Sequence, residues 1–363
     1  MSVVPATRRC RAFELAGLTV LVLTQFGGGQ GPQGHGIAVA SQAEAPQEFR
    51  VDPLRGPVDL GLTDPALVGA IDIHAHFDPD APGSGGVVRG IDAFDAAVIA
   101  KQRGMRGFVF KTHQDPASAG VAYLVRKHGA PGLEVFGRMA QNLSTGGINV
   151  AALEHFTQIK GGWGRIVEMP TRDSEFRARS ENPETLAQTR PWILLQPLTA
   201  PKYVSVSRNG ELLPEVKYFL EVTAKLRTVD SNGRLALATG HASPEEHLLL
   251  AREGRRLGLQ VVLTHPREIP QLEEAAKLGA YIEITVGPVV RNATAARDAA
   301  GWIRRVGAGS IILSTDCGQM SNPLPSDCIA LAARALRGQG VTDRELDLML
   351  KENPAKLLGL PPL

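Results

Sequence analysis

The chain has 363 residues, of which 43% are hydrophobic and 21% are charged. This composition excludes a wholly disordered chain, a collagen and a pure coiled coil, and the length suits one α/β barrel with extensions. The net charge is +2 and no basic run is long enough to follow a phosphate backbone, so nucleic acid is not an expected partner.

The N-terminus has the pattern of an export signal. A basic segment containing Arg8-Arg9 precedes the apolar stretch Leu15–Thr24, and a small-x-small site follows at Ala38–Ala40. The apolar stretch is about half of the roughly twenty residues that a spanning helix needs. We therefore expect residues 1–40 to be removed, leaving an exported protein, periplasmic or secreted, without a membrane span. The arginine pair leaves twin-arginine export open beside the general route, and an uncleaved anchor is the alternative.

The mature chain keeps two cysteines, Cys317 and Cys328. An exported protein can pair them. They are separated by a predicted strand end and the start of a predicted helix, a placement that favours free thiols. We expect them to be unpaired.

Residues 68–363 alternate short apolar segments with amphipathic ones. The predicted strands are Ala70–Ile73, Gly107–Phe110, Leu133–Phe136, Arg165–Met169, Leu235–Thr239, Gln260–Thr264, Ala280–Thr285 and Ser310–Thr315. The predicted helices include Ile91–Arg103, Ala119–His128, Pro244–Leu257, Pro270–Leu278 and Ala295–Val306. Eight strand–helix units predict a closed (β/α)8 TIM barrel, with a doubly wound open sheet as the alternative. The polar, proline-rich residues 41–67 are predicted to form an extended arm.

The interval between the fourth and fifth strands is too long for one helix. It contains the turn signal Arg208-Asn209-Gly210, flanked by Tyr203–Val206 and Glu211–Leu213. We predict a hairpin insertion over the C-terminal end of the fourth strand, followed by a helix over 214–227.

The first strand ends in two histidines. Asp72, His74 and His76 are spaced two residues apart, which predicts that all three side chains lie on one face. Two imidazoles on one face form a chelating edge for a metal ion. The motif by itself is a weak signal, because chance produces it often.

Three further metal-capable residues follow predicted strands. His241 follows the fifth strand, His265 the sixth and Asp316 the eighth. In a barrel the C-terminal ends of all strands face one mouth, where the active sites of this fold lie. The combined placement predicts a metal-binding mouth.

With these residues the sequence resembles the metal-dependent amidohydrolase superfamily, in an uncharacterised branch. The resemblance covers about residues 68–361 and includes the C-terminal segment Glu352–Leu360. It implies a TIM-barrel hydrolase that acts on a small molecule. Dimers and tetramers are common in that superfamily, so a homo-oligomer is an expectation.

The resemblance also implies roles for five residues. His74 and His76 match ligands of the deeper metal, and His241 and His265 match ligands of a second metal. Asp316 matches the aspartate that binds metal and takes the proton of the attacking water. The implied cofactor is one or two divalent ions, Zn²⁺ first and Mn²⁺ second, which would lower the pKa of a bound water to about 7.

The bridging ligand between two ions is left open. Glu168 on the fourth strand is one candidate. Lys111, at the end of the second strand, is another if it is carboxylated; as an ammonium it would instead bind an anionic group or the oxyanion. A single-metal site without a bridge is the third alternative. His113 shares the face of Lys111 and is expected to be a ligand or a substrate contact.

Other histidines and acids have less specific expectations. His247, on the predicted helix after the fifth strand, is expected to be a surface or packing residue. Glu283 either faces the barrel interior or pairs with a neighbouring helix. Arg172, Arg267 and Gln319 follow strand ends and are candidates for substrate contacts.

The leading hypothesis is an exported metal-dependent hydrolase of an amide, cyclic amide or lactone. The alternatives are phosphotriester hydrolysis, deamination or decarboxylation, and a noncatalytic metal- or ligand-binding barrel. Fold and metal site do not choose among the reactions.

Overall fold

The computed structural model describes residues 59–80, 89–113, 117–180, 202–266 and 271–362. These residues belong to Glu48–Leu363, one of the two units into which the chain divides. The predictions for the export signal, for residues 41–58 and for Arg267 lie outside the described residues. None of the helices described in these ranges is both long and apolar enough to cross a membrane.

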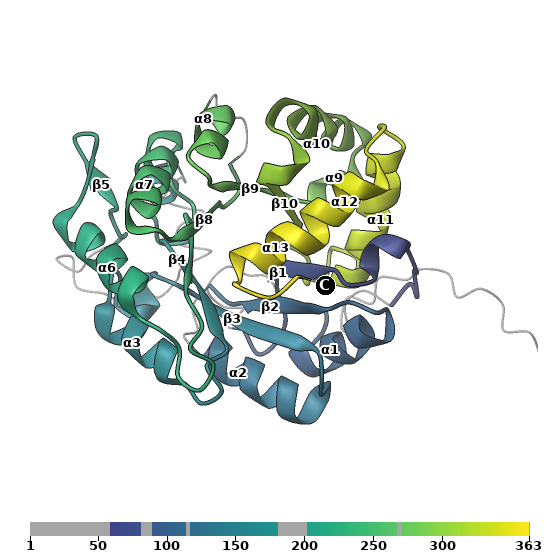
Figure 1. Ribbon diagram of the computed structural model, residues 1–363, viewed down its shortest axis with the longest axis horizontal. Helices are drawn as coiled ribbons and strands as arrows, with labels where there is room; N and C mark the ends of the chain where they lie inside the picture. Colours follow the sequence, from purple (N-terminus) through teal and green to yellow (C-terminus); the bar gives the residue numbers. More distant parts are fainter. Residues whose placement is uncertain (1–58, 81–88, 114–116, 181–201, 267–270, 363) are drawn as a thin grey trace, which may run out of the picture. The chain divides into compact units, whose positions relative to one another are not determined.

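Eight parallel strands form one sheet whose spatial order is the chain order (Figure 1). They are β1 (Ile71–Ala75), β2 (Gly107–Lys111), β3 (Glu134–Ala140), β4 (Gly164–Glu168), β7 (Ala236–Ala238), β8 (Gln260–Leu263), β9 (Tyr281–Thr285) and β10 (Ile311–Ser314). A doubly wound sheet would reverse its order at a switch point, and this sheet does not. The (β/α)8 barrel prediction is confirmed.

The barrel closes between β1 and β10 through the residues that follow these strands. The His76 amide donates to the Cys317 carbonyl at 2.9 Å, and the Asp316 amide donates to the His74 carbonyl at 2.8 Å. The two backbone segments pass so closely that a Cβ added at Gly318 would overlap the His76 carbonyl oxygen. Glycine is therefore required there, and the seam fixes Asp316 beside the first strand.

Asp72 is part of this seam, and the prediction that it shares a face with His74 and His76 is wrong. The register of β1 against β2 shifts between Asp72 and Ala75, which breaks the two-residue alternation. The Asp72 carboxylate accepts bonds from the Thr315 amide at 3.0 Å and from the Thr315 hydroxyl. Burial raises the pKa of Asp72, while these bonds lower it. Asp72 holds the two barrel ends together and is not part of the mouth.

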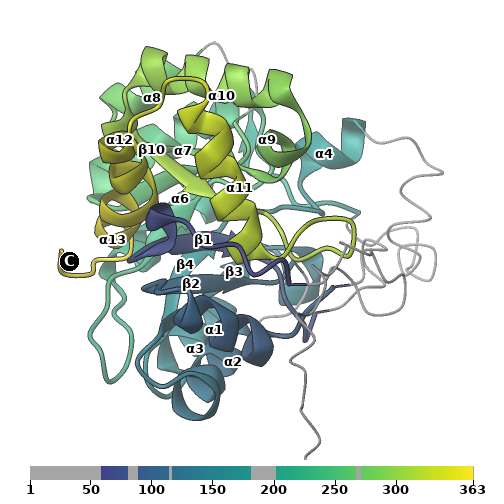
Figure 2. The same cartoon turned by 90° about the vertical axis from the view of Figure 1, so that its right-hand side faces the viewer.

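Helices surround the sheet. Figure 2 shows α1, α2 and α3 on one outer side of β1–β4 and α10, α11 and α12 on the other. The helices are α1 (Ala93–Gln102), α2 (Ser118–Leu124), α3 (Val150–Gln158), α4 (Glu175–Ser180), α6 (Pro214–Lys225), α7 (Pro244–Leu257), α8 (Leu272–Lys277), α9 (Gly287–Arg291), α10 (Ala293–Val306), α11 (Pro325–Arg337), α12 (Asp343–Asp347) and α13 (Asn353–Leu357). The predicted limits of α7 are confirmed: Ser243 and Glu246 form a capping box at its start, and Gly258 ends it with φ +71°.

Two hydrophobic layers support the strands. Ile73, Val109, Phe136 and Ile166 belong to the cluster that fills the barrel interior. A larger cluster packs between the strands and the helices. Because side chains alternate along a strand, the residues two positions after Val109, Phe136 and Ile166 also point inward, nearer the C-terminal mouth. These three residues, Lys111, Arg138 and Glu168, are all charged.

The predicted hairpin is present as β5 (Ser207–Arg208) and β6 (Glu211–Leu212). The Ser207 hydroxyl donates to Glu246 at 2.8 Å, so the hairpin lies against α7. The helix that follows, α6, ends two residues before the predicted limit. Its apolar residues Val216, Phe219 and Leu220 are buried, which explains why this insertion packs as part of the barrel wall.

Cys317 and Cys328 form a disulfide, so the expectation of free thiols is wrong. The loop after β10 turns back into α11 and brings the two Cα atoms to 6.9 Å. Linear separation along the chain did not reveal this approach. Both residues are fully buried.

Replacing both cysteines by alanine should lower the free energy of unfolding by about 2–4 kcal/mol, because the disulfide restricts the unfolded chain. Urea unfolding of the wild type and the double variant measures this difference. In strong reductant, the free energy of unfolding of the wild type should approach that of the double variant. Equal stabilities under oxidising conditions would contradict the prediction.

Candidate metal centre

Five histidines surround the C-terminal mouth of the barrel. His74 lies in β1, and His76, His113, His241 and His265 follow β1, β2, β7 and β8. Neighbouring rings form a closed circuit with centroid separations of 5.2, 5.0, 6.0, 5.4 and 5.1 Å. The structure brings together all five histidines that were predicted at the mouth.

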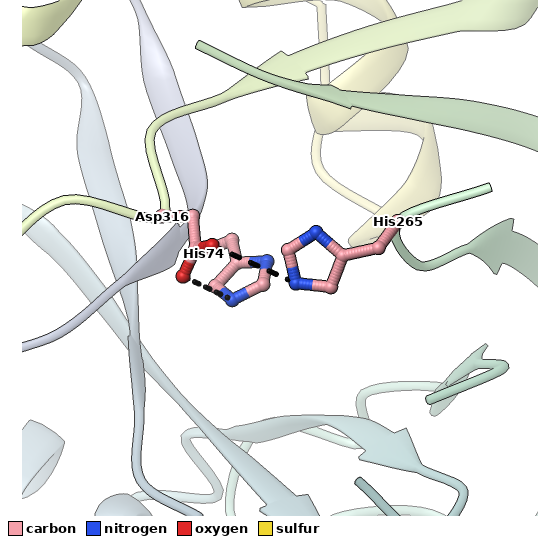
Figure 3. Close-up of side chains that lie close together, drawn as sticks. All are labelled: His74, His265 and Asp316. Carbon is pink, nitrogen blue, oxygen red and sulfur yellow. Dashed lines mark ion pairs between the residues drawn. The ribbon is translucent and has the colours of Figure 1, made fainter. Parts of the chain in front are cut away.

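Within this circuit, three side chains converge most closely. One ligand atom from each of His74, His265 and Asp316 lies within 4.8 Å of the others, a group that could hold a metal ion. Asp316 Oδ1 lies 3.3 Å from His74 Nε2, and Asp316 Oδ2 lies 3.7 Å from His265 Nε2 (Figure 3). His76 Nε2 lies 3.1 Å from Asp316 Oδ1 and adjoins this group.

The backbone at this group has an uncommon conformation. His265 and Asp316 both have φ +49°, in the left-handed region that side chains other than glycine rarely adopt. The other three such residues in the described part of the chain are asparagine or aspartate, and asparagine, aspartate and histidine adopt this conformation more often than other side chains do. Here it turns two strand ends so that their side chains meet.

Four of the five histidines of the circuit have lowered pKa values, which favour the neutral imidazole. Burial lowers the pKa of His265 to about 4, and burial lowers the pKa values of His76, His113 and His241 well below the ordinary value. At His74, burial and Lys111 lower the pKa, but Glu283 and Asp316 raise it above the ordinary value. A neutral imidazole is the form that binds a divalent ion.

Asp316 is held as a carboxylate. Burial raises its pKa, but the neighbouring imidazoles of His74, His265 and His76 bring the pKa well below the usual range. An anionic oxygen between imidazole nitrogens is a donor set suited to Zn²⁺ and similar ions. These residues therefore fit a divalent metal ion.

Glu283 orients His74. Its Oε1 lies 3.0 Å from His74 Nδ1 and accepts a bond from Ser314 Oγ at 2.8 Å. A carboxylate behind a metal-binding imidazole fixes the tautomer and leaves Nε2 as the acceptor. Consistent with this, Lys111 Nζ lies 2.8 Å from His74 Nε2. The structure selects the inward orientation of Glu283 that the sequence left open.

A buried charged network lies directly below the histidines. Arg138 binds both carboxylate oxygens of Glu168, at 2.9 and 2.6 Å, and lies 3.8 Å from Glu283. Lys111 Nζ lies 3.2 Å from Glu168 Oε1. Burial lowers the pKa of Lys111 to about 8; burial raises the pKa of Glu168, but the charges of Arg138 and Lys111 lower it below the ordinary value.

Sequence reasoning missed Arg138. The predicted third strand ended at Phe136, whereas β3 continues to Ala140. Arg138 is two residues after Phe136, so extending the alternation by one step would have placed a fully buried arginine in the barrel.

The remaining predicted residues have defined contacts. His113 Nδ1 lies 3.0 Å from Thr171 Oγ1, and His241 Nδ1 lies 3.2 Å from Arg177 Nη1. Neither His241 nor Glu168 is in the group of three. His247 is buried and contacts the Thr239 hydroxyl at 2.7 Å, in agreement with a packing role.

A cavity of about 200 Å³ adjoins the group of three. It lies between the ends of β8 and β9 and helix α10, and its lining includes His265, Glu283, Ile284, Val289 and Trp302. The walls are mostly apolar. A cavity of this size and lining suits part of a small molecule.

Solved structures share this fold. An amidohydrolase from Burkholderia multivorans, with bound HEPES, is 10% identical, with coverage of 80% of this chain and 99% of that chain and a TM-score of 0.50. An amidohydrolase from Pseudomonas aeruginosa is 13% identical, with 81% and 96% coverage and a TM-score of 0.48. A mutant organophosphorus hydrolase from Deinococcus radiodurans is 15% identical, with 86% and 98% coverage and a TM-score of 0.46. At 10% identity, the match with a TM-score of 0.50 shows the barrel fold and not the reaction.

The sequence comparisons identify the family. No protein of curated function matches the chain. The model of a family of unknown function, DUF6282, matches residues 69–283. Because this match spans more than half of the 363 residues, the chain belongs to the family of unknown function DUF6282.

Proposed function

We propose that this protein is an exported metal-dependent hydrolase that cleaves an amide, cyclic amide or lactone bond in a small molecule. The observation that carries the proposal is the convergence of His74, His265 and Asp316 at the C-terminal mouth. This is the end of the barrel where the active sites of TIM-barrel enzymes lie. The amidohydrolase of the same fold from Burkholderia multivorans supports the choice of bond.

His74 Nε2, His265 Nε2 and the Asp316 carboxylate would hold the ion, with His76 beside them. A divalent ion held there would lower the pKa of a water molecule to about 7 and would polarise the substrate carbonyl. Glu283 keeps His74 in the tautomer that can bind. The donor set of imidazoles and a carboxylate supports Zn²⁺ first and Mn²⁺ second.

Asp316 is the proposed general base. Its oxygens contact His74 and His76 at 3.3 and 3.1 Å, and its side chain is about a quarter exposed toward the mouth. The low pKa keeps it unprotonated near neutral pH. It can take the proton of the attacking water and return it to the leaving nitrogen or oxygen.

One feature supports the proposed size of the substrate, and two others support the proposed compartment of the protein. The cavity beside His265 and Glu283 is large enough for a small substituent and has apolar walls. The N-terminal leader pattern and the Cys317–Cys328 disulfide both suit an oxidising, extracytoplasmic compartment.

Chelator treatment followed by Zn²⁺ or Mn²⁺ reloading of the mature protein tests the proposal. We expect turnover within a panel of amides, cyclic amides and lactones, loss of turnover after metal removal, and recovery after reloading. Phosphotriesters in the same panel test the competing reaction.

The variant His74→Gln should prevent recovery by reloading, because it removes a ligand. His155→Gln is the matched control, since His155 is exposed on α3, outside the circuit. Failure of the wild-type protein to bind metal would support the noncatalytic alternative instead.

A further inference from the structure

Three side chains bear on whether the mouth can hold a second metal ion. A second ion would need a bridging carboxylate and further ligands, for which the sequence offered Glu168, carboxylated Lys111 and His241. Each of these residues has a contact that opposes a ligand role.

Glu168 is already bound by an arginine. Arg138 Nε and Nη2 donate to Oε2 and Oε1 of Glu168 at 2.9 and 2.6 Å, a two-pronged contact between fully buried groups. Arg138 is held in turn by the Thr264 hydroxyl and the Ile73 carbonyl, at 3.1 and 3.2 Å. Releasing Glu168 to a metal ion would leave the buried guanidinium with only Glu283, at 3.8 Å, as a counter-ion, which is costly.

Lys111 lies between the metal-binding histidine and this carboxylate. Its Nζ is 2.8 Å from His74 Nε2 and 3.2 Å from Glu168 Oε1, and its side chain is fully buried. A lysine ammonium donates hydrogen bonds and cannot accept them, and both contacts are with atoms that can accept. The contacts therefore suit a Lys111 that is not carboxylated. A metal ion on His74 Nε2 would take the place of this contact, and Lys111 would then keep its contact with Glu168 as a cation of the protein.

His241 presents a proton to the mouth. The guanidinium of Arg177 contacts its Nδ1 at 3.2 Å, and a guanidinium has no acceptor. Nδ1 is therefore the acceptor, and the imidazole carries its proton on Nε2. That nitrogen can donate to a substrate oxygen but has no lone pair for a metal ion.

We propose that the centre holds one divalent ion, at His74, His265 and Asp316. Where a second ion would need its ligands, Lys111 and Arg138 provide cations and His241 provides a hydrogen-bond donor. This inference rests on the proposed metal-dependent function and specifies its stoichiometry. It also assigns Glu168 the role of counter-ion and leaves the His241 Nε2 proton available for substrate.

Titration of the metal-free mature protein with Co²⁺, followed by its visible absorption, tests the stoichiometry. We expect saturation at one equivalent per chain, with elemental analysis after dialysis giving the same value. Saturation at two equivalents would overturn the inference while leaving the proposed function intact. No binding at all would overturn both.

The variants His241→Gln and His265→Gln form a matched pair. We expect His241→Gln to keep one equivalent with a Kd within about threefold of the wild type, and His265→Gln to bind at least about 100-fold more weakly, since lost partners of metal ligands already cost 10–100-fold. Circular dichroism checks that both variants fold. A loss in His241→Gln comparable to that in His265→Gln would overturn the inference.

Whether Lys111 is carboxylated can be measured separately from the metal titration. NMR of the wild-type protein in isotope-enriched bicarbonate should show no protein-bound carbamate. A carbamate signal that disappears in Lys111→Gln would overturn the inference, because it would identify Lys111 as a bridging carboxylate. This measurement does not depend on knowing the substrate.

Discussion

Replacement of Asp316 by asparagine should lower kcat by about 100-fold or more, the typical contribution of a positioned general base. Asparagine keeps the shape of the side chain and one oxygen near His76, but it cannot accept a proton. Steady-state kinetics at saturating metal, on a substrate found in the panel, measures the effect. KM should change by much less than kcat, since substrate binding does not require the base.

The matched control is Asp95→Asn, the same chemical change on the exposed face of α1. It should leave kcat unchanged. Metal content of Asp316→Asn has to be measured in the same experiment, because Asp316 is also a proposed ligand. A kcat within tenfold of the wild type, with metal present, would remove Asp316 from the role of general base.

Replacement of Arg138 by methionine should destabilise the protein by about 3–5 kcal/mol, the usual cost of breaking a buried ion pair from one side. Arg138 is fully buried, and Glu168 would lose both of its guanidinium contacts. Lys111, at 3.2 Å, would remain as its neighbour but occupies only one carboxylate oxygen. Urea unfolding with a common m-value measures the difference.

The double variant Arg138→Met/Glu168→Gln separates charge from packing. Removing both charges together should recover at least half of the lost stability, because no carboxylate is then left unpaired. The double-mutant cycle with Glu168→Gln gives the coupling between the two residues. Additive effects of the two substitutions would show that the pair is not the source of the destabilisation.

Much of the mouth was predictable because the barrel repeats one local pattern. The strand order in space follows the chain order, so residues at equivalent strand ends meet without any knowledge of distant packing. His74, His76, His113, His241 and His265 were all placed at strand ends from the sequence, and their rings form one circuit. Alternation within β2 likewise placed Lys111 on the inward face.

The departures have local physical causes. A register shift in β1 turned Asp72 away from His74, because the strand must fit the closing seam with β10. The third strand continues to Ala140, so Arg138 was missed. The disulfide depends on a loop that turns back to α11, which separation in sequence does not reveal.

The sequence by itself determined the barrel, the set of histidines and Asp316 at one mouth, because these follow from periodicity and from the common direction of parallel strands. Only the tertiary structure decided the partners of these groups. Glu283 was assigned to His74, Arg138 to Glu168 and Arg177 to His241 by contacts between residues far apart in sequence. A pattern along one strand specifies which way a side chain points, but not which side chain of another strand lies opposite it.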